Sequence, residues 1–138
     1  MSLDIEESVR EGIVVLHLNG RLIVGQPVTD LRAKITELAQ KGTPNVVLDM
    51  TRVDYIDSTG LGGMVIGHTT LKKAGGALKL LNLNRRGMEL LVITKLNTVF
   101  PAFDDEISAV NSFFPGREIK KFDILQFVQD HKDENSLE

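Results

Sequence analysis

The chain of 138 residues contains no cysteine. This absence excludes a disulfide framework, a thiolate nucleophile and a cysteine-based zinc site, and it fits a reducing cytosol. Residues 1–7 lack the basic region and the apolar run of a signal peptide, and no apolar stretch approaches the length of a membrane span. The sequence therefore predicts a cytoplasmic location without membrane contact.

Positive charge is also scarce, because the net charge is −3 and no run of Lys or Arg exceeds two residues. Proteins that bind nucleic acid mainly through its phosphates need a basic patch that releases counterions. Nucleic acid is therefore not an expected partner. An apolar fraction of 42% with 25% charged residues is ordinary for a globular protein, and the length fits a single domain with a real core.

The spacing of apolar residues and turn signals predicts an α/β fold. The expected elements, in chain order, are strands over 5–9 and 13–18 joined by a turn at Glu11–Gly12, a helix over 27–40, a strand over 46–50, a short loop, a helix that opens at Ser58 and is closed by Gly75–Gly76, a strand over 77–82, a helix over 86–95, a strand over 99–102 and a helix that opens at 104–105. The second strand is apolar on both faces, which is typical of a strand covered on both sides. The strand–helix–strand unit implies a parallel crossover.

Pro115 and Gly116 mark a break, after which residues 116–138 form a C-terminal extension beyond a domain over 1–115. The extension carries one amphipathic pattern, Phe122, Leu125, Phe127 and Val128, with Asp123 as the expected N-cap. We expect one helix there, which either docks on the core or mediates self-association, so a homodimer is left open.

The most informative stretch is Asp57-Ser58-Thr59-Gly60-Leu61-Gly62-Gly63, where a helix opens after a buried strand. We expect Ser58 to cap this helix, since Ser and Thr satisfy unpaired N–H groups at helix starts. A phosphate would be well accommodated there, because the N-terminus is the positive end of the helix dipole. The stretch is either an ordinary cap or a hydroxyl held out for chemical modification.

The helix after Ser58 has two contrasting sides on a helical wheel. Its core stripe is Leu61, Met64, Val65, His68 and Leu71. The opposite side carries Thr59, Gly63, Ile66 and Thr70, with Gly60 and Gly67 at its margin. Because each glycine costs a helix about 1 kcal/mol relative to Ala, we interpret this smooth side as a docking surface for another protein. The alternative is that the glycines pack against a neighbouring element of the same chain.

A hydrolase that uses Ser58 is disfavoured by geometry. His68, the obvious base beside Asp57, lies ten positions along the same helix as Ser58, or roughly 15 Å away. The Gly-x-Ser-x-Gly pattern is absent as well. His17 and His131 have no evident partner in the sequence, so we expect each to be structural or solvated.

Nucleotide and metal sites are poorly supported too. The run Gly60–Gly63 lacks both the G-x-G-x-x-G spacing and the lysine of a P-loop. Asp49, Asp54 and Asp57 supply carboxylates, but no second cluster of ligands accompanies them. No cofactor and no metal are expected.

Three stretches together resemble the STAS domain of anti-sigma factor antagonists: Val47–Met50, Asp54–Gly62 and Gly75–Leu78. The similarity runs from about Asp4 to Phe113, and its D-S-[ST]-G-L-G core is quite specific. The resemblance implies a mixed β-sheet with helices packed mainly on one side, here with an extra C-terminal helix. It also implies that the domain over 1–115 is not an enzyme.

In function, the resemblance implies a serine switch at Ser58, with Thr59 as a second acceptor. An anti-sigma factor that is also a serine kinase phosphorylates this serine, and a PP2C-type phosphatase reverses the reaction. The unphosphorylated form binds the anti-sigma factor and so releases a sigma factor for transcription. The expected partner-binding residues are Asp57, Gly60, Gly63, Ile66, Gly67 and Thr70.

The chain departs from this pattern at one position. Relatives often carry an acidic residue after G-x-[LV], where it contributes to partner or kinase contacts, but here Gly20-Arg21-Leu22 is followed by Ile23. Together with the tail, this departure motivates an alternative: a STAS-type regulatory scaffold that binds another signalling partner without a sigma factor.

Overall fold

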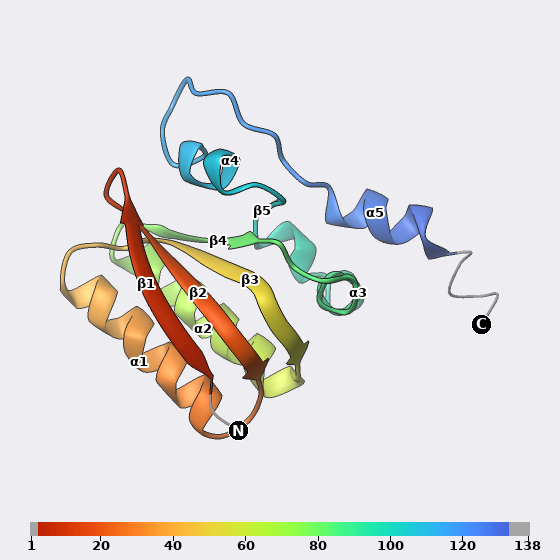
Figure 1. Ribbon diagram of the computed structural model, residues 1–138, viewed down its shortest axis with the longest axis horizontal. Coiled ribbons are helices and arrows are strands. Elements are labelled where there is room, and N and C mark those ends of the chain that lie inside the picture. The colour runs from red at the N-terminus through yellow and green to blue at the C-terminus, as the bar shows by residue number, and fades with distance from the viewer. Residues whose placement is uncertain (1–2, 133–138) are drawn as a thin grey trace.

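The computed structural model describes residues 3–132, and its centre is a five-stranded sheet in the order β1-β2-β3-β4-β5 (Figure 1). The strands are β1 (Asp4–Arg10), β2 (Ile13–Leu22), β3 (Asn45–Ile56), β4 (Ala77–Leu81) and β5 (Ala102–Phe103). β1 and β2 form an antiparallel hairpin, whereas β3, β4 and β5 continue the sheet in parallel with β2. The predicted mixed sheet and its parallel crossover are confirmed.

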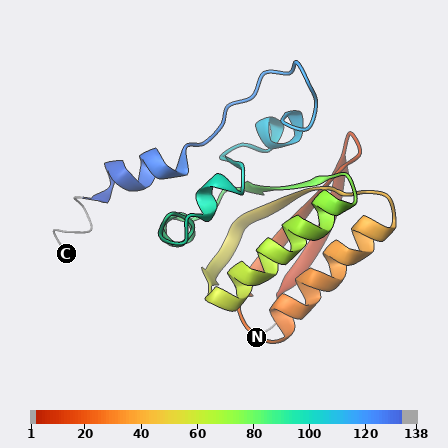
Figure 2. The same cartoon turned by 180° about the vertical axis from the view of Figure 1, so that it is seen from behind.

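Two long helices, α1 (Gln26–Gln40) and α2 (Ser58–Lys73), lie side by side on one face of the sheet (Figure 2). The short helix α4 (Glu106–Asn111) covers one end of the opposite face. Successive side chains of a strand point to opposite faces of the sheet, so each strand contributes residues to the cores on both faces. Leu16 and Leu48 belong to the core beneath α1 and α2, and Val15 and Val47 to the smaller core beneath α4. The helices therefore lie mainly on one side, as predicted.

β2 is buried on both faces only in its first half. Residues 13–16 are all buried, but the face covered by α4 becomes polar and open from His17 onward. The prediction of a strand covered on both sides is therefore wrong for its second half. α4 has only 6 residues, so it is too short to cover the whole sheet.

β3 is longer than predicted, because residues 51–56 continue the strand where the sequence predicted a loop. Its second half pairs with Asn19–Leu22 of β2 through two register shifts, which keep the two twisted strands together. The strand predicted over 99–102 is present only as the two-residue β5, which begins at Ala102, and a 3₁₀ turn, η1 (Leu96–Thr98), lies directly before the predicted range. β5 pairs with only two residues of β4.

The last helix of the described residues, α5 (Ile124–Asp130), packs on α3 (Arg85–Ile93) (Figure 1). The Asp123 carboxylate caps α5 by accepting a hydrogen bond from the Gln126 N–H at 3.0 Å, as predicted. The expected apolar stripe is wrong at Leu125, which is 42% exposed. Its neighbour Ile124 is the buried residue.

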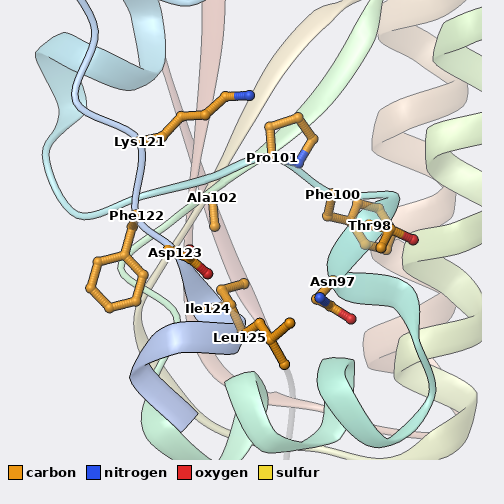
Figure 3. Close-up of a pocket in the computed structure, with 10 residues that line it drawn as sticks. All are labelled: Asn97, Thr98, Phe100, Pro101, Ala102, Lys121, Phe122, Asp123, Ile124 and Leu125. Carbon is orange, nitrogen blue, oxygen red and sulfur yellow. The ribbon is translucent and has the colours of Figure 1, made fainter. Parts of the chain in front are cut away.

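The tail thus docks on the core, which is one of the two expected arrangements. A cavity of about 190 Å³ remains between η1, β5 and residues 121–125 (Figure 3). Residues 133–138 of the predicted extension lie outside the described part of the chain. None of the helices within residues 3–132 has the length and apolar character needed to cross a membrane.

Candidate functional site

The start of α2 is capped by Asp57, not by Ser58 as predicted. Asp57 has an extended backbone, and its Oδ1 accepts a hydrogen bond from the Gly60 N–H at 2.7 Å. Its Oδ2 accepts a second hydrogen bond, at 2.9 Å, from the N–H of Val24 in the loop after β2. Both residue types are good caps, and the longer β3 places Asp57 at the cap position. Ser58 is consequently the first residue of α2.

This shift by one residue leaves the Ser58 hydroxyl available. The residue is exposed, and its side chain makes no hydrogen bond to any residue in the described range 3–132. Thr59 is exposed as well. Both hydroxyls therefore lie at the positive end of α2, and neither makes a hydrogen bond within residues 3–132.

The glycines of α2 do not form an exposed docking surface, so this part of the prediction is wrong. Gly60, Gly63 and Gly67 are all buried. A Cβ atom on Gly63 would lie 3.0 Å from Cγ1 of Val28, and one on Gly67 would lie 2.7 Å from Cδ1 of Ile35. Both neighbours belong to α1. The glycines thus allow α1 and α2 to pack closely, which is the alternative interpretation given for the sequence.

Gly60 is the tightest of these positions. A Cβ atom there would run into the carbonyl oxygen of Leu22 at the end of β2. The same carbonyl accepts a hydrogen bond from the Asp57 N–H at 3.2 Å. Gly60 therefore has a structural role at the junction of β2 and α2.

The exposed side of α2 is instead formed by residues that follow Ser58 at helical spacing. Gly62, Ile66 and Thr69 lie four, eight and eleven positions after Ser58, which places them on one face of the helix. Ile66 is 45% exposed, and Val24, which is bonded to the Asp57 cap, is 64% exposed. We call the set Ser58, Gly62, Ile66, Thr69 and Val24 the switch face.

Three of the predicted partner-binding residues remain close to this surface. Asp57 is partly exposed at the cap, Ile66 lies in the middle of the switch face, and Thr70 is half-buried beside it. The Thr70 hydroxyl donates a hydrogen bond to the backbone carbonyl of Ile66 at 2.9 Å.

His68 lies on the core side of α2, as predicted. Its ring packs edge-on against Phe100, with the ring centroids 5.6 Å apart. Within residues 3–132, Nδ1 of His68 has no hydrogen-bond partner. Burial lowers the pKa of His68, and the nearby positive charge of Lys72 lowers it further. The imidazole is a packing group here and cannot serve Ser58.

The structure gives His17 a partner that the sequence analysis missed. His17 Nδ1 lies 2.7 Å from Oδ2 of Asp49, and His17 Nε2 lies 2.9 Å from Oγ of Ser8. The three residues come from β1, β2 and β3, so only the strand register brings them together. Ser8 and His17 lie on one face of the hairpin by strand alternation, and Asp49 lies opposite His17 in the parallel pair, but neither register can be read from the sequence alone.

Asp49 is held as a carboxylate. Burial alone would raise its pKa, but hydrogen bonds from Thr51 and His17 outweigh this effect and lower the pKa below its usual value. Asp49 and Asp57 serve different parts of the fold, and no group of three metal-ligating side chains occurs among the described residues.

The comparisons with known proteins agree with this architecture. The STAS domain model matches residues 4–109. The anti-sigma-B factor antagonist of Bacillus subtilis (strain 168) is 34% identical over 100 residues, which cover 72% of this chain and 89% of that protein.

Among solved structures, the anti-sigma factor antagonist SpoIIAA in its unphosphorylated form gives a TM-score of 0.61 at 23% identity, over 83% of this chain and 99% of that one. The phosphorylated form of SpoIIAA, described as a Bacillus cell fate determinant, gives a TM-score of 0.62 at 23% identity, over 80% and 97% of the two chains. At this identity, the likeness to SpoIIAA shows the fold.

Proposed function

We propose that this chain, which belongs to the STAS family of anti-sigma factor antagonists, is a binding module that phosphorylation of Ser58 switches off. The members of this family are non-enzymatic. The proposal rests mainly on a difference between two adjacent residues at the start of α2. Asp57 caps the helix, whereas the exposed Ser58 hydroxyl has no hydrogen bond within residues 3–132. A kinase can modify such a hydroxyl without first breaking a structural contact.

The switch face supplies the docking surface in this proposal. Ile66 and Val24 offer apolar contacts, and Gly62 leaves room between Ser58 and Ile66 for a close approach. Ile66 lies eight helical positions after Ser58, or roughly 12 Å along the axis. A phosphate on Ser58 would therefore lie within the area that a docked protein covers.

Electrostatics explains why phosphorylation would end binding. A phosphoserine adds about −1.5 to −2 charges at neutral pH. On Ser58 this charge would lie beside the Asp57 carboxylate, which repels it. Docking would also have to remove water from the strongly hydrated phosphate, and this desolvation costs free energy. The unmodified serine carries no such cost.

The partner in this proposal is an anti-sigma factor with serine kinase activity. The unphosphorylated protein binds it in the cytoplasm and releases a sigma factor, and a PP2C-type phosphatase restores the unphosphorylated form. Two relatives support this assignment: the Bacillus subtilis protein is an antagonist of an anti-sigma-B factor, and SpoIIAA exists in both phosphorylation states.

Incubation with the anti-sigma kinase of the same cell and ATP tests the assignment. Intact-mass measurement should show one phosphoryl group on the unaltered protein and on Thr59→Ala, and none on Ser58→Ala. Undiminished phosphorylation of Ser58→Ala would move the acceptor to another residue.

Ile23 supports the alternative of a STAS scaffold that acts on a different signalling partner. It is half-buried in the loop that Asp57 anchors through Val24, and it is apolar where the family resemblance leads us to expect an acidic residue. A pull-down from the native cell separates the two functions. Recovery of a kinase-fold anti-sigma protein supports the switch, whereas recovery of another regulator without such a protein supports the scaffold.

A further inference from the structure

β1 forms an open edge of the sheet. It pairs with β2 alone, and its 7 residues are exposed except for the half-buried Ile5. An unpaired strand edge presents a row of backbone N–H and C=O groups that another strand can bind.

The hairpin turn determines the direction of the backbone groups. Glu11 and Gly12 form a two-residue turn with φ values of 54° and 83°, which is typical of a type I′ hairpin. The pair next to the turn, Arg10 and Ile13, is then hydrogen-bonded, and such pairs alternate along the strand. Consequently Ile5, Glu7 and Val9 direct their N–H and C=O groups away from β2, toward the open edge.

Charges on an edge strand usually prevent association, and β1 carries four of them: Asp4, Glu6, Glu7 and Arg10. Their order, however, is self-complementary. When a second β1 is placed antiparallel with Glu7 opposite Glu7, each Asp4 faces an Arg10, each Ile5 faces a Val9 and each Glu6 faces a Ser8. Opposite charges and apolar pairs across strands are stabilising.

Each Glu7 of the central pair of like charges already has a positively charged partner within its own chain. Lys34 of α1 lies 3.2 Å from the Glu7 carboxylate, so two glutamates and two lysines would meet at the symmetry axis. Val9 is apolar and 62% exposed, and it lies on the same face of β1 as the half-buried Ile5, with Glu7 between them. Pairing with Ile5 of a second chain would cover it.

We infer that β1 is a homodimer interface, in which two copies of this chain join antiparallel across their β1 edges and form one continuous ten-stranded sheet. This inference is independent of Ser58 and of the partner proposed for it. The interface is isologous, since the same strand meets itself about a two-fold axis.

The flank of α1 gives the second copy room to approach. A hollow of about 350 Å³ lies beside β1, and it is lined by Leu3, Ile5, Asp30, Ala33, Lys34 and Glu37. In a continuous sheet the two α1 helices would face each other across these hollows. The small side chain of Ala33 leaves space on this flank of α1. Lys34 lies between Glu7 and Glu37, so lysines and glutamates of the two chains would meet between the helices.

Charge exchange at Asp4 and Arg10 tests this register. Sedimentation velocity of the full chain over a concentration series should show a monomer–dimer equilibrium. Asp4→Arg places Arg opposite Arg10, and Arg10→Asp places Asp opposite Asp4, twice in each dimer. Each single variant should raise the dimer dissociation constant at least about tenfold. Arg10 also lies 3.3 Å from the Glu106 carboxylate of its own chain, so circular dichroism should confirm that Arg10→Asp is as fully folded as Asp4→Arg.

Two combinations of these substitutions restore opposite charges across the interface and so test the pairing of Asp4 with Arg10. The double variant Asp4→Arg/Arg10→Asp should dimerise like the unaltered chain, and an equimolar mixture of the two single variants should form a heterodimer although each variant dimerises only weakly alone. An unaltered chain that stays monomeric at every concentration would overturn the inference, and so would a dimer that the single variants leave intact. Neither result bears on Ser58 phosphorylation, which is measured separately.

Discussion

The Asp57 carboxylate joins the start of α2 to the loop after β2, because its Oδ2 accepts a hydrogen bond from the Val24 N–H at 2.9 Å. The other carboxylate oxygen caps the helix through Gly60. One side chain therefore holds two parts of the switch face together, and it does so next to the serine that we propose as the phosphorylation site. A phosphate on Ser58 would add negative charge beside this junction.

Replacement of Asp57 should separate its two roles. Asp57→Ala removes the cap and the contact with Val24, and we expect a loss of about 1–2 kcal/mol in the free energy of unfolding. Asp57→Asn keeps one acceptor for the cap, so its loss should be smaller. Urea unfolding measures both, and equal stability of the alanine variant and the unaltered protein would contradict the assigned cap.

Two glycines in the first two turns of α2, Gly60 and Gly62, offer a matched comparison. In Gly60→Ala, the added methyl group meets the Leu22 carbonyl, and such overpacking costs about 1–3 kcal/mol. Gly62→Ala adds the same group where nothing lies within 4 Å, so the higher helix propensity of Ala should stabilise the protein by up to about 1 kcal/mol. Thermal unfolding should move in opposite directions for the two variants, and a shift in the same direction would contradict the packing of α2.

His68 should make stability depend on pH. Its folded-state pKa is lowered by burial and by Lys72, so the unfolded chain binds the proton more tightly. Stability is then greatest above the unfolded pKa of about 6.5 and falls as the pH drops through that value. The urea midpoint should decrease between about pH 7.5 and pH 5.5 by more in the unaltered protein than in His68→Leu. An equal decrease in both would assign the effect to other groups.

Two adjacent residues of the tail test how α5 docks. Ile124 is buried, whereas its neighbour Leu125 is 42% exposed. Ile124→Ala should cost about 2–5 kcal/mol if α5 unfolds together with the core, and Leu125→Ala should change stability by less than about 0.5 kcal/mol. Similar effects in both variants would argue against the observed docking of α5 on α3.

Much of the fold could be predicted from local patterns. The hairpin turn at Glu11–Gly12, the parallel unit around α2 and the Asp123 cap depend on neighbouring residues, and all are present in the structure. The core stripe with Leu61 and Met64 follows from helical periodicity in the same way.

The orientation of the α2 glycines could not be predicted, because α2 is buried on two sides at once. Met64 is buried in the same core as the sheet residues, and Gly63 and Gly67 pack against α1, so the buried arc of α2 is wider than an apolar stripe suggests. Glycine is neutral in hydropathy and fits both an open surface and a close helix contact. Only the position of α1 decides between them.

The network of Ser8, His17 and Asp49 also escaped prediction, for a different reason. Its members are separated by 9 and 32 residues in sequence and meet only through strand register. The identity of the capping residue depended on where β3 ends, and the register shifts that extend β3 leave no clear local pattern.

The affinity of the anti-sigma factor for the two phosphorylation states of this chain tests the central proposal most directly. Calorimetry should compare the unmodified protein, the protein phosphorylated on Ser58 and Thr59→Ala as the control for the neighbouring hydroxyl. We expect tight binding of the unmodified protein and of Thr59→Ala, and at least about tenfold weaker binding after phosphorylation, which corresponds to about 1.4 kcal/mol. Equal affinity of the phosphorylated and unmodified proteins would contradict the switch at Ser58.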